Sequence, residues 1–186
     1  MICFVRLRYL LVLDLNELGD GSIPGITPEW GAMLAQGAAV CLESQEHAQG
    51  VMLAVRGDVM SSQPVTWSPV TDQALRTWAE PRVATERGAE AIAVLLAQRE
   101  TDHTVIEMSR QGTGFDFWLG EESGIALQRK ARLEVSGIRQ GNDGDVRARV
   151  RQKLRQIERY NSRYGDMQAW VIVVEFGRPL AEVHMT

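Results

Sequence analysis

The spacing of apolar residues in the second half of the chain predicts a helix, three strands, a second helix and a fourth strand, in that order. Apolar residues three and four apart predict a helix over 86–98, after a break at Pro81 and with Thr85 as its N-cap. Alternating or continuous apolar runs predict strands at 104–109, 115–119, 131–136 and 169–176. A long basic segment predicts the second helix, at about 145–160.

The first half of the chain has fewer strong patterns. Residues 1–26 are interpreted as an N-terminal extension, or as a strand followed by a loop, with glycine, proline and acidic residues making 15–29 loop-like. Thr27 and Pro28 have the residue types of an N-cap and first turn, so a helix is expected from there through Leu42. Strands are expected at 49–57 and 65–67, and a short helix at 71–78.

Size and composition indicate a single globular domain spanning residues 1–186. The chain is 45% hydrophobic and 24% charged, without a repeat or a linker-like segment. The predicted fold class is α/β, with a mixed central sheet flanked by helices. Arg6 and Arg8 interrupt the apolar start, which argues against a signal peptide, and no segment has membrane-spanning length. Two cysteines without metal-ligand spacing fit a reduced, cytoplasmic setting.

The charge of the chain is unevenly distributed. The net charge is −4, which excludes a polycation that coats nucleic acid, but residues 129–163 hold 11 of the 20 basic residues and only four acids. Arginines recur every four residues in the last predicted helix, forming an arginine stripe (Arg147, Arg151, Arg155 and Arg159). The stripe predicts contact with nucleic-acid phosphates; the alternative is a solvated helix surface.

Two acidic residues lie on neighbouring predicted strands. Asp116 begins the strand after Gly112-Thr-Gly114, and Glu134 lies within the next strand. If these strands pair antiparallel, the two carboxylates converge, and Mg²⁺ is the usual cation that relieves such repulsion. Each acid also has a structural alternative: Asp116 can bond backbone amides after the turn, and Glu134 can form a cross-strand ion pair.

This arrangement resembles the PD-(D/E)XK nuclease superfamily, which has a helical Glu, a strand Asp and then Glu-X-Lys on the next strand. The matching positions are Glu90 (or Glu86), Asp116 and Glu134-Val135-Ser136, within a nuclease-like core at 85–176. The runs GTGFDFWLG and ARLEVSG also resemble an uncharacterised bacterial group associated with this fold. The resemblance implies a restriction-endonuclease-like core and a Mg²⁺-dependent nuclease, or a nuclease-like component of a bacterial genome-defence or mobile-element system.

The sequence departs from that pattern at Ser136, where the superfamily usually has lysine. Lys130 and Arg132 share a face with Glu134 if the strand is regular, and Lys153 in the following helix is a third candidate cation. The implied metal ligands are Asp116 and Glu134, with Glu90 assisting unless it is a solvated helix acid. The loss of lysine leaves an alternative open: a catalytically silent module that binds a protein partner or nucleic acid.

Overall fold

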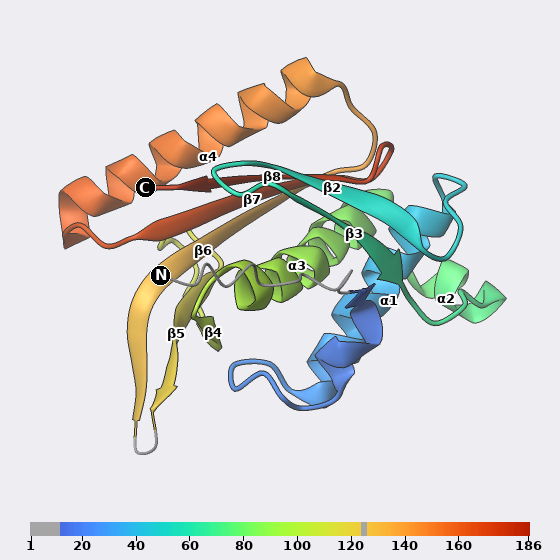
Figure 1. The fold of residues 1–186 in the computed structure, drawn as a ribbon, viewed down its shortest axis with the longest axis horizontal. Coiled ribbons are helices and arrows are strands. Elements are labelled where there is room, and N and C mark those ends of the chain that lie inside the picture. The colour runs from blue at the N-terminus through green and yellow to red at the C-terminus, as the bar shows by residue number, and fades with distance from the viewer. Residues whose placement is uncertain (1–11, 124–125) are drawn as a thin grey trace, which may run out of the picture.

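The computed structural model describes residues 12–123 and 126–186, and within them the strands form one eight-stranded mixed sheet (Figure 1). The strand order across the sheet is β1-β3-β2-β8-β7-β6-β5-β4. The strands are β1 (Leu13–Asp14), β2 (Val51–Gly57), β3 (Ser61–Thr66), β4 (Thr104–Met108), β5 (Phe117–Ser123), β6 (Ala126–Ile138), β7 (Ala169–Glu175) and β8 (Leu180–Met185). The predicted mixed α/β class is confirmed.

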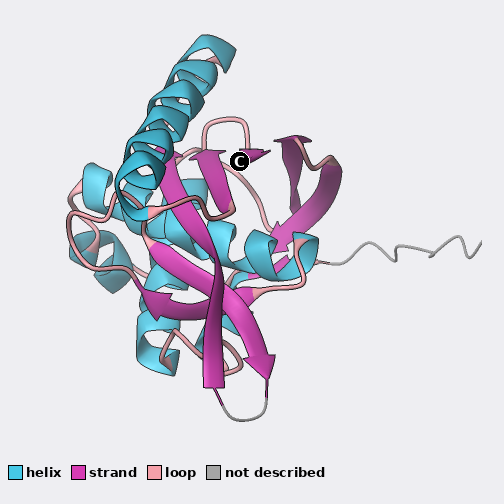
Figure 2. Cartoon of the chain, turned by 90° about the vertical axis from the view of Figure 1, so that its left-hand side faces the viewer, coloured by secondary structure: helices cyan, strands magenta, loops and turns pink. Residues whose placement is uncertain are grey.

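Helices cover both faces of the sheet. α1 and α3 pack against each other, and α3 also lies against β6 and β7, whereas α4 packs on the opposite face over β6, β7 and β8 (Figures 1 and 2). The helices are α1 (Pro28–Glu43), α2 (Asp72–Thr77), α3 (Pro81–Glu100) and α4 (Asp143–Tyr164), and a short 3-10 helix, η1, spans Leu15–Gly19. In the described residues, no helix is long and apolar enough to cross a membrane.

The helix starts follow from local capping chemistry. The predicted cap at Thr27 is confirmed, since its side chain accepts a hydrogen bond from the Trp30 amide. The prediction that Pro81 breaks the chain and Thr85 caps the next helix is wrong. Pro81 occupies the first turn of α3, where its missing N–H costs nothing, and Glu80 is the N-cap.

The segment after Pro81 has the predicted order α3-β4-β5-β6-α4-β7. β5 pairs antiparallel with β6, as the convergence of the two acids requires, and β6 runs parallel to β7 after the α4 crossover. β6 is 13 residues long, and the β5–β6 hairpin extends well away from the centre of the sheet (Figures 1 and 2). β8 was not predicted; it pairs antiparallel with β7 and parallel with β2, joining the two halves of the sheet.

The N-terminal prediction is tested only in part. Residues 1–11 lie outside the described residues, and with them Cys3, Arg6, Arg8 and most of the expected strand or extension. Within the described part, Leu13–Asp14 forms β1, which pairs with β3. The segment expected to be a loop contains η1, whose Leu15 and Leu18 are buried.

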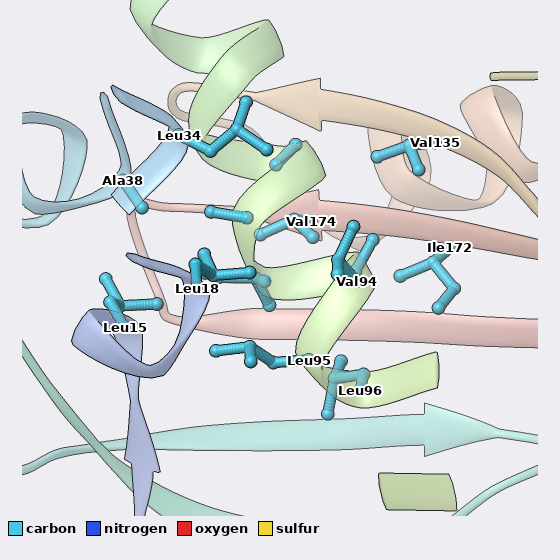
Figure 3. Close-up of a cluster of buried hydrophobic side chains, with 14 of the residues drawn as sticks. Leu15, Leu18, Leu34, Ala38, Val94, Leu95, Leu96, Val135, Ile172 and Val174 are labelled. Carbon is cyan, nitrogen blue, oxygen red and sulfur yellow. The ribbon is translucent and has the colours of Figure 1, made fainter. Parts of the chain in front are cut away.

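The main core lies between α3, α1 and the sheet. α3 is buried around most of its circumference, so it contributes Val94, Leu95 and Leu96 in different directions (Figure 3). A Cβ added at Gly88 of α3 would meet the Ala38 Cα of α1 at 2.9 Å, so glycine allows the close approach of these helices. A second cluster lies between α4 and the other face of the sheet and includes Phe115, Val146, Val150, Ile157, Val171 and Val173.

Candidate functional site

Asp116 and Glu134 lie together where β5 begins beside β6. The Asp116 amide donates to the Leu133 carbonyl over 2.9 Å, and its carboxylate accepts from the Val135 amide over 2.8 Å. The latter contact is the backbone role considered for Asp116, so this acid is both a structural acceptor and a candidate ligand. The Glu134 side chain is only 2% exposed and points toward α4, where Lys153 Nζ lies 2.5 Å from Oε1 and Gln156 Nε2 lies 3.2 Å from it.

The two carboxyl groups perturb each other. Burial raises the pKa of Asp116, against the opposing effects of the Val135 amide and Lys153. Burial, and then the charge of Asp116, raise the pKa of Glu134 to about 8 although Lys153 lowers it. At neutral pH the pair therefore retains a proton in place of a second negative charge.

Glu90 of α3 approaches the same pair from the other side of the site. Its carboxylate accepts two hydrogen bonds from Arg87 Nη1, at 2.7 and 2.9 Å. Burial raises the pKa of Glu90 to about 7, with Asp116 adding to the effect and Arg87 opposing it. Because Glu90 is only 8% exposed, the alternative of a solvated helix acid is wrong; Glu86 is the exposed acid, paired with Arg82 at 2.8 Å.

The acids line two adjoining pockets. The larger has a volume of about 780 Å³ and is lined by Glu90 and Asp116; the smaller, about 440 Å³, is lined by these two and by Glu134. Basic side chains from α3, from α4 and from the residue that follows β6 surround the larger pocket: Arg82, Arg87, Arg139, Arg149 and Lys153. The site is thus an acidic centre inside a basic rim, an arrangement suited to a cation together with an anionic ligand.

Sequence reasoning missed Arg149, although it lies four residues before Lys153 on the same face of α4. Its Nη1 donates to the Ser136 hydroxyl over 2.7 Å and reaches the Gly137 carbonyl at 3.4 Å. A guanidinium group therefore lies against the position where the nuclease pattern has lysine. The available signal was the i, i+4 spacing of Arg149 and Lys153, which places both on one flank of the helix.

The three candidate replacement cations have different surroundings. Lys153 contacts Glu134 directly. Lys130 is exposed and lies outside the lining of both pockets, because a bulge opposite Leu119 and Gly120 interrupts the regular alternation on which its alignment with Glu134 depended. Arg132 is buried, bonds to Asn161 and the Gly165 carbonyl, and lies over the Tyr160 ring at 4.7 Å, so it stabilises the end of α4.

The arginine stripe lies on a different flank of α4. Val146, Val150 and Ile157 face the sheet, whereas Arg147, Arg151 and Arg155 are exposed and are absent from the lining of both pockets. At 3.6 residues per turn, Arg151 points about 160° away from Arg149 around the helix axis. Contact of the stripe with nucleic acid is untested, and its position away from both pockets favours the alternative of a solvated helix surface. On the pocket side of α4, Gln156 bonds to Glu134 and to the Gly114 carbonyl.

The donor chemistry of the acidic pair fits a hard divalent cation. Asp116 and Glu134 supply carboxylate oxygens, which Mg²⁺ prefers, and a cation would replace the proton that the pair now retains. Among the described residues, no three or more His, Cys, Asp or Glu side chains are grouped closely enough to hold a metal ion. A metal at this site would therefore rely on the pair, with water or substrate oxygens completing its coordination.

Comparisons with known protein families, with curated proteins and with solved structures give no match to this chain. Function is therefore inferred from the geometry of the Asp116–Glu134 pair and its pocket.

Proposed function

We propose that this chain is a Mg²⁺-dependent phosphodiesterase that acts on nucleic acid, with a core related to the PD-(D/E)XK nucleases. The observation that carries the proposal is the position of Asp116 beside Glu134, fixed by its bonds to the Leu133 carbonyl and the Val135 amide, next to Lys153 and at the edge of a basic pocket. The order α3-β4-β5-β6-α4-β7 supports the relationship, because it is the order of elements in the nuclease pattern.

Each residue then has a distinct role. Asp116 and Glu134 would hold the cation, and Mg²⁺ bound there would supply an acidified water and offset charge on the phosphate. Lys153 provides the positive charge that Ser136 lacks, from α4 instead of β6. Gln156 bonds Glu134 and thereby fixes the direction of its carboxylate. Glu90, held by Arg87, adds a second acidic group beside Asp116.

A catalytically silent module that binds nucleic acid or a protein is the second candidate. Two observations favour it: serine stands at the motif position, and the Lys153 ammonium already lies 2.5 Å from the Glu134 carboxylate that would bind metal. In this alternative, Lys153 permanently neutralises the acidic pair and no cation is needed.

Cleavage assays separate the two candidates. Linear DNA, circular DNA and RNA are incubated with the wild type and with Mg²⁺, Mn²⁺ or EDTA, alongside Asp116→Asn and Glu134→Gln. The proposal expects metal-dependent cleavage that both variants lose while their circular dichroism stays native. Glu158→Gln, an exposed acid on α4, is the matched control and should cut normally. A wild type that neither cuts nor binds either metal supports the silent module.

A further inference from the structure

The basic rim of the larger pocket contains two arginines without a carboxylate partner. Arg82 and Arg87 are each paired with an acid on their own helix, at 2.8 and 2.7 Å. Arg139, just beyond β6, makes no hydrogen bond or ion pair with the described residues, and Arg149 of α4 bonds only to the neutral Ser136 and Gly137 oxygens. Both arginines are half-buried in the pocket wall, so their charge faces a confined space.

Arg149 is held in place with donors to spare. A guanidinium group has five N–H donors. Two are directed at Ser136 and Gly137, both from Nη1, which leaves Nε and Nη2 without a partner among the described residues. A guanidinium fixed on one side and free on the other is pre-organised for a tetrahedral oxyanion, because little side-chain freedom remains to be lost on binding.

The position of Arg149 relative to the acidic pair indicates what the anion is. Ser136 follows Glu134 by two residues on the same face of β6, roughly 6.6 Å along the strand. This spacing is close to that of neighbouring phosphates along one nucleic-acid strand. The pocket, at about 780 Å³, is also much larger than a single phosphate ion requires.

We propose that Arg139 and Arg149 form a subsite for a non-reacting backbone phosphate of a nucleic-acid strand, next to the phosphodiester that lies over Asp116 and Glu134. The inference rests on the proposed function for its substrate class. The subsite itself requires no metal and no cleavage, because it consists of two guanidinium groups already present on the pocket wall.

Equilibrium binding in EDTA tests the subsite separately from catalysis. Fluorescence anisotropy of a labelled single-stranded oligonucleotide is measured for the wild type, Arg139→Gln, Arg149→Gln and Arg149→Lys over a range of salt concentrations. Arg76→Gln, which removes the same charge from the exposed surface of α2, is the matched control. Thermal unfolding of each variant establishes that it is folded at the assay temperature.

Each Gln variant is expected to weaken binding at least roughly tenfold, the scale of a charge-assisted hydrogen bond. Each Gln variant should also reduce the magnitude of the slope of log affinity against log salt by about 0.7, which is the slope expected for one phosphate contact on a single strand. Arg149→Lys should recover part of the affinity, and Arg76→Gln should match the wild type. Equal affinity of both Gln variants and the wild type overturns the subsite, as does an equal loss in Arg76→Gln.

Competition distinguishes a strand phosphate from a free one. Inorganic phosphate at the same total phosphate concentration should compete much more weakly than unlabelled oligonucleotide; equal competition overturns the assignment to a strand. The cleavage assay makes the two proposals separable. Arginine-dependent binding without cleavage keeps the subsite and rejects the enzyme, whereas cleavage and binding insensitive to both arginines keep the enzyme and reject the subsite.

Discussion

Lys153 of α4 and Glu134 of β6 form an ion pair of 2.5 Å between elements on facing layers, with side chains 19% and 2% exposed. The pair brings a cation to the acidic centre from the helix that follows the strand. It also connects α4 to the sheet at the point where Asp116 approaches Glu134. Whether the site functions in catalysis or only in binding, the charge balance of the acidic pair depends on this contact.

Replacing Lys153 with methionine should destabilise the protein in a pH-dependent way. Loss of one partner leaves a buried carboxylate without compensation, which costs up to about 3 kcal/mol. At pH 6, Glu134 can stay protonated in the folded state, so the cost should be small; at pH 9 it should be larger by about 1.4 kcal/mol, the free energy of keeping Glu134 protonated one unit above its pKa of about 8. Urea unfolding at both pH values measures the difference. Glu134→Gln combined with Lys153→Met should remove the difference in cost between the two pH values. An equal cost of Lys153→Met at both pH values would contradict the raised pKa of Glu134.

Wild-type stability should fall as the pH rises from about 5 to 8.5. The pKa of Glu134 is raised from 4.5 to about 8 and that of Glu90 from 4.5 to about 7, so the folded protein holds more protons than the unfolded chain in this interval. Such an excess makes the free energy of unfolding decrease with pH, here on the order of 3 kcal/mol from Glu134 alone. The contribution of Glu134 to the free energy of unfolding is complete below about pH 4.5 and is lost as the pH passes 8.

The variants Glu134→Gln and Glu90→Gln should each flatten that pH dependence, because an amide keeps the shape of the side chain but does not titrate. Thermal unfolding between pH 5 and 9 measures the slope. Glu158→Gln, whose side chain is exposed, should retain the wild-type slope. A wild-type stability that is constant or rises over this range would show that the acidic pair does not retain a proton.

Mg²⁺ should stabilise the protein more at pH 8.5 than at pH 6. Binding to Asp116 and Glu134 requires the retained proton to leave, so protons compete with the cation. Each tenfold rise in free Mg²⁺ above the dissociation constant adds about 1.4 kcal/mol to the free energy of unfolding. Differential scanning calorimetry at 10 mM Mg²⁺ or in EDTA measures the shift. Asp116→Asn should abolish it; an equal shift at both pH values, or in this variant, places the ion elsewhere.

Much of the fold was predictable from periodicity and capping residues. The order of elements after Pro81 follows from the change between helical and strand spacing, and Thr27 identifies the start of α1. Convergence of Asp116 and Glu134 required only that consecutive strands pair antiparallel. These features depend on interactions between residues that are close in the sequence, so they can be inferred from one amino-acid sequence.

The features that were missed depend on tertiary contacts. The six residues of β8 are a weak local signal, and that strand is defined by pairing with both β7 and the distant β2. Lys130 was predicted to share a face with Glu134 on the assumption that the strand is regular. A bulge interrupts β6 there, and one extra residue changes the face that a side chain occupies. Arg149 reaches Ser136 only because α4 crosses over β6, which the linear sequence does not specify.

The arginine stripe provides the last prediction, because it lies on the flank of α4 opposite the pocket. Arg151→Gln combined with Arg155→Gln should weaken oligonucleotide binding less than threefold at physiological salt. Exposed charges farther from the ligand than the Debye length, about 8 Å at this ionic strength, are largely screened. Anisotropy against salt concentration, with Arg149→Gln measured in parallel, compares the two flanks. A salt slope lower by about 1.4 in the double variant would instead place two strand phosphates on the outer flank.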